Sequence, residues 1–113
     1  MSWIEHHQRS EEFASLAEIL HRQGELEAAQ QNYAIAAAAE IQAINHIAPD
    51  EQRTLGITVV SAIALSFKAK DYFQAKQLAY HWLDRQQLPK FAVVQVEEML
   101  REILTIEALV MAG

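Results

Sequence analysis

The chain contains no cysteine, which excludes disulfide bonds, thiolate metal ligands and cysteine nucleophiles together. Proline and glycine are also scarce, with two and three copies in 113 residues. Because these two residues mark most sharp turns, the backbone has few places to reverse direction. The composition therefore favours a few long helices over many short strands. The lack of cysteine also agrees with a reducing compartment.

Basic residues are few, with 9 lysines and arginines against 15 acidic residues and a net charge of −6. They occur singly along the chain and form no basic stripe of the kind that displaces phosphate counterions. The most apolar stretch, residues 55–69, is too short and too polar to cross a bilayer. The N-terminus lacks the apolar run of a signal peptide. We therefore expect a cytoplasmic protein that contacts neither nucleic acid nor membrane.

Apolar residues and strong helix formers are abundant. Half of the chain (51%) is apolar, and alanine, leucine, glutamine and glutamate are common. A chain of this length normally forms one domain with its own core. The sequence thus predicts an all-α fold, with residues 1–113 in a single domain.

Breaks in the hydrophobic pattern divide the chain into about five helices. Gly24, Pro49, Lys70-Asp71 and Pro89 mark the connections. Ser10 is the expected N-cap of the first helix, which leaves residues 1–9 as a flexible N-terminus. The expected helices span about 10–22, 25–47, 50–69, 71–86 and 89–110. They group into a first hairpin (10–48), a second hairpin (49–87) and a C-terminal capping helix (88–113).

The first hairpin has a regular spacing of large and small side chains. The pattern runs through Phe13, Leu16, Ala17, Leu20, Gly24, Ala29, Tyr33 and Ala36. It resembles a tetratricopeptide repeat, in which small residues stand where two paired helices approach most closely and aromatic residues fill the space beside them. The resemblance implies right-handed helical hairpins that bind other proteins.

A second, looser copy of this pattern spans residues 60–82. Val60, Ile63, Ala64 and Phe67 match the first helix of the repeat, and Ala75, Ala79 and Trp82 match the second. The separation from Ala64 to Ala75 is one residue shorter than from Ala17 to Ala29, which predicts a shortened turn. The copies also stand 46 or 47 residues apart (29 to 75, 17 to 64), against about 34 in the family. The chain therefore resembles a degenerate tetratricopeptide-like domain.

The resemblance also implies a binding groove, because the first helix of each repeat lines the concave surface in this family. Carried over to this chain, the groove residues are Glu11, Glu18, His21 and Arg22 from the first helix and Thr58, Ser61, Leu65 and Lys68 from the third. The basic residues with which some family members hold a C-terminal carboxylate have no counterpart, since Ala14 and Glu18 occupy the matching places. An amphipathic helix or peptide of a partner protein fits this mixed surface better.

No catalytic or metal-binding motif stands out. The histidines follow no metal-ligand spacing, and the acidic pairs lie at helix starts or on polar faces. We therefore expect no enzyme activity, no cofactor and no metal site. The sequence predicts a protein-interaction module that binds a peptide or helix of another protein. The alternative is a self-associating structural protein, a homodimer formed through the C-terminal helices.

Overall fold

The structure is a computed structural model that describes residues 2–113. The described residues form five helices, in agreement with the expected all-α fold. They are α1 (Trp3–Arg22), α2 (Leu26–Ile44), α3 (Gln52–Lys68), α4 (Tyr72–Arg85) and α5 (Lys90–Ala112).

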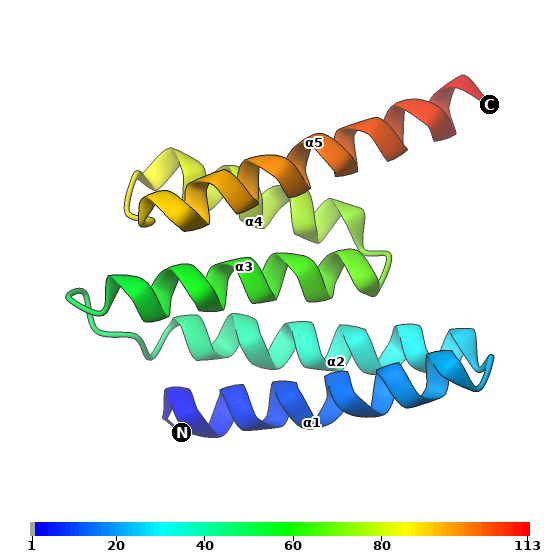
Figure 1. The fold of residues 1–113 in the computed structure, drawn as a ribbon, viewed down its shortest axis with the longest axis horizontal. Helices are drawn as coiled ribbons and strands as arrows, with labels where there is room; N and C mark the ends of the chain where they lie inside the picture. Colours follow the sequence, from blue (N-terminus) through cyan, green and yellow to red (C-terminus); the bar gives the residue numbers. More distant parts are fainter. Residues whose placement is uncertain (1) are drawn as a thin grey trace.

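The helices pack in chain order into a flat body of 42 × 33 × 17 Å. Each helix contacts the next, and α5 also contacts α3. Figure 1 shows α1, α2 and α3 side by side, with α4 and α5 beyond α3. The α1–α2 and α3–α4 turns lie at the same end of this body, on the right in Figure 1, and the α2–α3 and α4–α5 connections lie at the other. The two hairpins therefore point the same way.

The first helix begins much earlier than expected. Ser2 caps it through a reciprocal pair of hydrogen bonds: the Glu5 amide donates to the Ser2 hydroxyl (3.3 Å), and the Ser2 amide donates to the Glu5 carboxylate (3.1 Å). Ser10, the expected N-cap, is buried inside α1 instead. The expected flexible segment 1–9 is therefore corrected for residues 3–9, which are helical, while Met1 lies outside the described residues.

The α1–α2 and α3–α4 turns have the same geometry. In the first, Gly24 (φ +80°) donates to the His21 carbonyl (3.0 Å) and Glu25 donates to the Leu20 carbonyl (2.9 Å). This bond pair is the Schellman ending of a helix.

The second turn repeats this ending at a constant offset of 46 residues (from 24 to 70). Lys70 (φ +60°) donates to the Phe67 carbonyl (2.9 Å), and Asp71 donates to the Ser66 carbonyl (3.0 Å). The expectation of a shorter second turn is therefore wrong. With the turns aligned, the counterpart of Ala17 is Ile63 rather than Ala64, and both of these side chains are fully buried.

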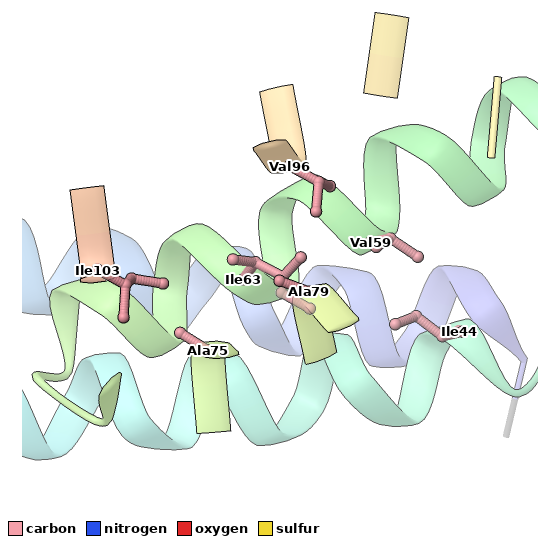
Figure 2. Packing of buried hydrophobic residues seen from close by; sticks show 8 residues of the cluster. Ile44, Val59, Ile63, Ala75, Ala79, Val96 and Ile103 are labelled. Carbon is pink, nitrogen blue, oxygen red and sulfur yellow. The ribbon is translucent and has the colours of Figure 1, made fainter. Parts of the chain in front are cut away.

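The core consists of two hydrophobic clusters. The smaller one joins α1, α2 and α3 and is built mostly from alanines: Ala17, Tyr33, Ala36, Ala37, Leu65 and Ala69. The larger one joins the end of α2 to α3, α4 and α5 and is shown in Figure 2; it contains Ile44, Val59, Ala62, Ile63, Ala75, Ala79, Val96 and Ile103. Small side chains let helices approach closely, whereas each large one adds about 1.5–3 kcal/mol when fully buried. The second hairpin and α5 thus hold most of the large buried aliphatic side chains.

Candidate functional site

A pocket opens at the end of the molecule where the two Schellman turns lie. It has a volume of about 340 Å³, which is within the range of small ligand sites. We call it the turn-end pocket, and its lining residues are His21, Tyr33, Phe67, Lys68, Lys70 and Tyr72. They come from four helices and from the α3–α4 turn. The pocket therefore exists only because both hairpins end at the same place.

The walls of the turn-end pocket are aromatic. Tyr33 is largely buried, at 8% exposure, and the Lys68 ammonium lies 5.7 Å from the centre of its ring. Phe67 and Tyr72 pack edge to face with their ring centres 5.4 Å apart. Such rings offer apolar surface for a ligand while the tyrosine hydroxyls remain available as polar groups. A cation over an aromatic face is also attracted to it electrostatically.

Nearby charges act on Tyr33 in opposite directions. Burial is the main cause that raises the pKa of the Tyr33 hydroxyl; the negative charge of Glu18 raises it further, and the positive charge of Arg22 opposes this. The hydroxyl therefore stays protonated and able to donate a hydrogen bond at neutral pH. Glu18 and Arg22 must both lie near the pocket to have this influence.

The cations at this pocket form no ion pair within the residues that the structure describes. In the described residues, ion pairs join His7 to Glu11 and Glu40, and Lys76 to Glu107. None of these pairs includes Arg22, Lys68 or Lys70, and no carboxylate lines the turn-end pocket over the residues that the structure describes. The pocket is thus locally cationic in a chain that is acidic as a whole.

Two further hollows adjoin the pocket through Lys70. A small one of about 100 Å³ shares His21, Tyr33, Lys68 and Lys70 and adds Leu26, Ala29 and Gln30. A larger one of about 620 Å³ lies between α2 and the α3–α4 turn and has a mixed charge, because Glu27 and Asp71 line it beside Lys70. One oxygen of the Asp71 carboxylate accepts a hydrogen bond from the Gln74 amide at 3.0 Å.

The eight groove residues expected from the sequence fall into separate places. His21 and Lys68 line the turn-end pocket, and Glu18 and Arg22 lie near it. Thr58 and Leu65 are buried, so neither is open to a partner in this structure. Glu11 pairs with His7, and Ser61 is half-buried on α3.

The sequence pattern does not assign Tyr33, Phe67, Lys70 or Tyr72 to a site. Tyr33 and Phe67 match positions of the repeat, and Lys70 marks a connection between helices. The one feature of the sequence that could indicate this site is Lys70, which is equivalent to Gly24 and has Phe67 and Tyr72 three positions before and two positions after it. That equivalence depends on the turn geometry, because the residue pattern pairs Ala17 with Ala64, one position beyond its structural counterpart.

A second polar cluster ties the start of α1 to its neighbours. The His7 Nδ1 atom lies 3.0 Å from a carboxylate oxygen of Glu40, a residue only 1% exposed, and the His7 Nε2 atom lies 2.8 Å from Glu11. Trp3 stacks on the His7 ring at 4.7 Å and donates from its indole nitrogen to the Thr58 hydroxyl at 3.1 Å. This cluster therefore links α1 to α2 and α3.

The protonation of His7 follows from these contacts. Burial favours the neutral ring, but the hydrogen bonds and charges of Glu40 and Glu11 outweigh burial and raise the pKa of His7. Both ring nitrogens face carboxylates, so the His7 ring bridges Glu11 of α1 and Glu40 of α2.

The described residues offer neither a membrane-spanning helix nor a metal-binding cluster. No helix there is long and apolar enough to cross a membrane. No group of three or more histidine, aspartate or glutamate side chains within residues 2–113 is arranged to hold a metal ion. The chain significantly matches no protein-family model, no curated protein and no solved structure.

Proposed function

We propose that this chain is a non-catalytic protein-interaction module built from tetratricopeptide-like hairpins. The observation that carries the proposal is the turn-end pocket, where three adjoining hollows meet at Lys70 between two equivalent helix turns. A peptide segment or helix of a partner protein lies across these hollows. The buried alanines at Ala17, Ala29 and Ala75 support the hairpin resemblance, because each is at most 1% exposed where paired helices meet.

Site-specific photocrosslinking tests this function in the source cell. Tyr72 is replaced by benzoylphenylalanine in the full chain, and Lys90, exposed at the opposite end of the body, is replaced in a control. We expect a discrete covalent adduct with another protein from position 72 and none from position 90. Adducts of equal yield from both positions, or none from position 72, would contradict the proposal.

A second candidate is self-association through the C-terminal helix. Val96, Ile103 and Val110 follow one another at seven-residue steps along α5; the first two are fully buried, whereas Val110 is 74% exposed. Leu109 and Met111 beside it are also exposed, and the end of α5 projects beyond α4 in Figure 1. The apolar stripe of α5 thus continues beyond α4, where its side chains are exposed in the part of the chain that the structure describes.

Light scattering over a range of protein concentrations separates the two candidates. A monomeric mass at all concentrations supports a module with an open site. A concentration-dependent dimer that Val110→Glu converts to monomer supports self-association, because a charge replaces apolar surface at the contact. The exposed position of Val110 makes this variant compatible with the folded monomer.

A further inference from the structure

We propose that the turn-end pocket binds an acidic side chain of a peptide segment. The carboxylate lies between Lys68 and Lys70, beside His21, and the rest of the segment packs on the rings of Tyr33 and Tyr72. This inference rests on the proposed function and adds the chemistry of the partner. It concerns glutamate or aspartate side chains within a peptide.

The charge distribution is the first argument. A chain with a net charge of −6 repels acidic ligands at most of its surface, so a cationic pocket is a local exception. Lys68 and Lys70 form no ion pair in the described residues, while the largely buried carboxylate of Glu40 has His7 as its partner. An external carboxylate would supply the charge that the pocket lacks. A Lys–carboxylate contact of this kind is stronger than a neutral hydrogen bond.

The acidic groups around the pocket leave room for such a ligand. Glu27 and Asp71 line the larger hollow on the other side of Lys70, where one Asp71 oxygen accepts a hydrogen bond from the Gln74 amide, and neither carboxylate lines the turn-end pocket. Glu18 and Arg22 act on the Tyr33 hydroxyl with opposite signs, and neither lines the pocket. The charged side chains that do line the pocket are those of Lys68 and Lys70.

The aromatic side chains give the peptide an apolar surface beside the lysines. Tyr33, Phe67 and Tyr72 line the same pocket as Lys68 and Lys70, so a segment that places a carboxylate there can also pack on their rings. The protonated Tyr33 hydroxyl can also donate toward an anion. Apolar methylenes of a glutamate side chain would pack on the same rings, which favours a peptide over an inorganic anion.

The backbone at Lys70 explains how the charge is placed. Its φ of +60° puts a lysine in the left-handed region, which is unfavourable for a residue with a Cβ. The equivalent residue in the first hairpin is Gly24, which adopts this conformation without such strain. Glycine would serve the turn better at position 70. Gln86 adopts a similar angle (φ +56°) at the end of α4, so the conformation alone does not mark a site; at position 70 it places an ammonium group at the pocket and at both adjoining hollows.

The test uses backbone amide shifts of the ¹⁵N-labelled full chain at low salt. The probes are three blocked octapeptides that differ only in charge: one with four glutamates alternating with serine and tyrosine, one with glutamine at those four places, and one with lysine. Glutarate and inorganic phosphate are the small-anion controls. We expect the glutamate peptide to shift the amides of His21 and residues 67–72 and to bind at least tenfold more tightly than the glutamine peptide. This preference should fall as salt is added, because the charges are exposed to solvent.

Three variants connect the binding to the pocket. Lys70→Gly removes the ammonium but keeps the left-handed turn, so a loss of binding cannot be attributed to unfolding. We expect Lys70→Gly and Lys68→Gln each to weaken the glutamate peptide about three- to fivefold, the size of one exposed charge pair. Lys90→Gln removes an exposed cation at the opposite end and should change the dissociation constant less than twofold.

Each outcome decides one claim. If the glutamine peptide binds at the same amides as tightly as the glutamate peptide, the acidic preference is overturned while the peptide-binding function stands. If no peptide shifts these amides, the acidic ligand is overturned, and photocrosslinking at position 72 judges the proposed function separately. Glutarate or phosphate binding as tightly as the peptide would overturn the peptide assignment. Unchanged binding by Lys70→Gly would overturn the role of Lys70.

Discussion

The first and second hairpins share one turn geometry but differ in what surrounds it. The α1–α2 hairpin uses Gly24 at the left-handed position and packs mainly through alanines, whereas the α3–α4 hairpin uses Lys70 and packs through larger side chains. The first hairpin thus has glycine at the left-handed position of its turn and mostly small side chains in its core. The second has a lysine at the left-handed position of its turn and larger side chains in its core.

The largest expected effect lies in the core positions that the turn alignment makes equivalent. Ile63→Ala should lower the free energy of unfolding by about 2–5 kcal/mol, because it leaves a cavity in the larger cluster. The reciprocal change, Ala17→Ile, should lower it by about 1–3 kcal/mol through overpacking between α1 and α2. Urea denaturation of both variants measures this. A loss below 1 kcal/mol for Ile63→Ala would contradict the expected contribution of large buried side chains to the stability of the second hairpin.

Substitutions of the two left-handed turn residues should change the free energy of unfolding in opposite directions. Gly24→Ala should destabilise the chain by about 1–2 kcal/mol. The reason is conformational alone, since a Cβ at Gly24 would meet no atom within 4 Å. Lys70→Gly should leave stability unchanged or raise it by up to about 1 kcal/mol, since strain is relieved while the unfolded chain gains freedom. Thermal unfolding of the two variants checks the signs, and a destabilised Lys70→Gly would argue against the left-handed turn.

The two N-caps offer a smaller and matched comparison. Asp71 caps α4 through the Gln74 amide, whereas Glu25 starts α2 with nearly the same backbone angles and makes no side-chain cap. Asp71→Ala should cost about 1 kcal/mol, and Glu25→Ala should be close to neutral. Glu25→Asp should raise the stability by part of that roughly 1 kcal/mol, because an aspartate at this position can accept the capping hydrogen bond that Glu25 does not make. Denaturation midpoints of the three variants measure the differences; equal losses for both alanine variants would contradict them.

The smallest effect concerns pH and belongs to the first hairpin. The pKa of His7 is raised in the folded chain, so its ion pairs with Glu40 and Glu11 stabilise the fold fully below the unfolded value of about 6.5. That stability is lost as the pH rises from there through the folded pKa. We expect a loss of less than about 1 kcal/mol, because one partner, Glu11, is exposed.

Measuring unfolding at pH 5.5 to 9 tests this dependence. His7→Gln should flatten the change, and His81→Gln, an exposed histidine of α4, should not. A wild-type stability that rises over this range would contradict the assigned ion pairs.

The sequence predicted the helices better than it predicted the site. Helix-forming composition and the four breaks at Gly24, Pro49, Lys70-Asp71 and Pro89 indicate the five helices, because these signals are local. The start of α1 was misplaced because Ser10 resembles an N-cap as much as Ser2 does, and only the Ser2–Glu5 bonds distinguish them. A serine followed by glutamates therefore does not by itself decide whether the helix begins at position 2 or at position 10.

The site was harder because it depends on which residues meet. His21 and Lys68 were expected at a groove and line the turn-end pocket, but Thr58 was expected there and is buried beside Trp3. The position of Lys70 follows from a backbone angle that no composition or spacing encodes. The contacts of Trp3 and His7 cross between helices far apart in sequence, so no local pattern predicts them.

The most direct test measures stability and binding on one sample of Lys70→Gly. The account predicts that this variant unfolds at the same or a higher denaturant concentration than the natural chain, while its dissociation constant for the glutamate octapeptide rises about three- to fivefold. Such a result would separate the cost of the lysine in the fold from its use in the pocket. A variant that is clearly less stable, or one that binds the acidic peptide as well as the natural chain does, would contradict the account.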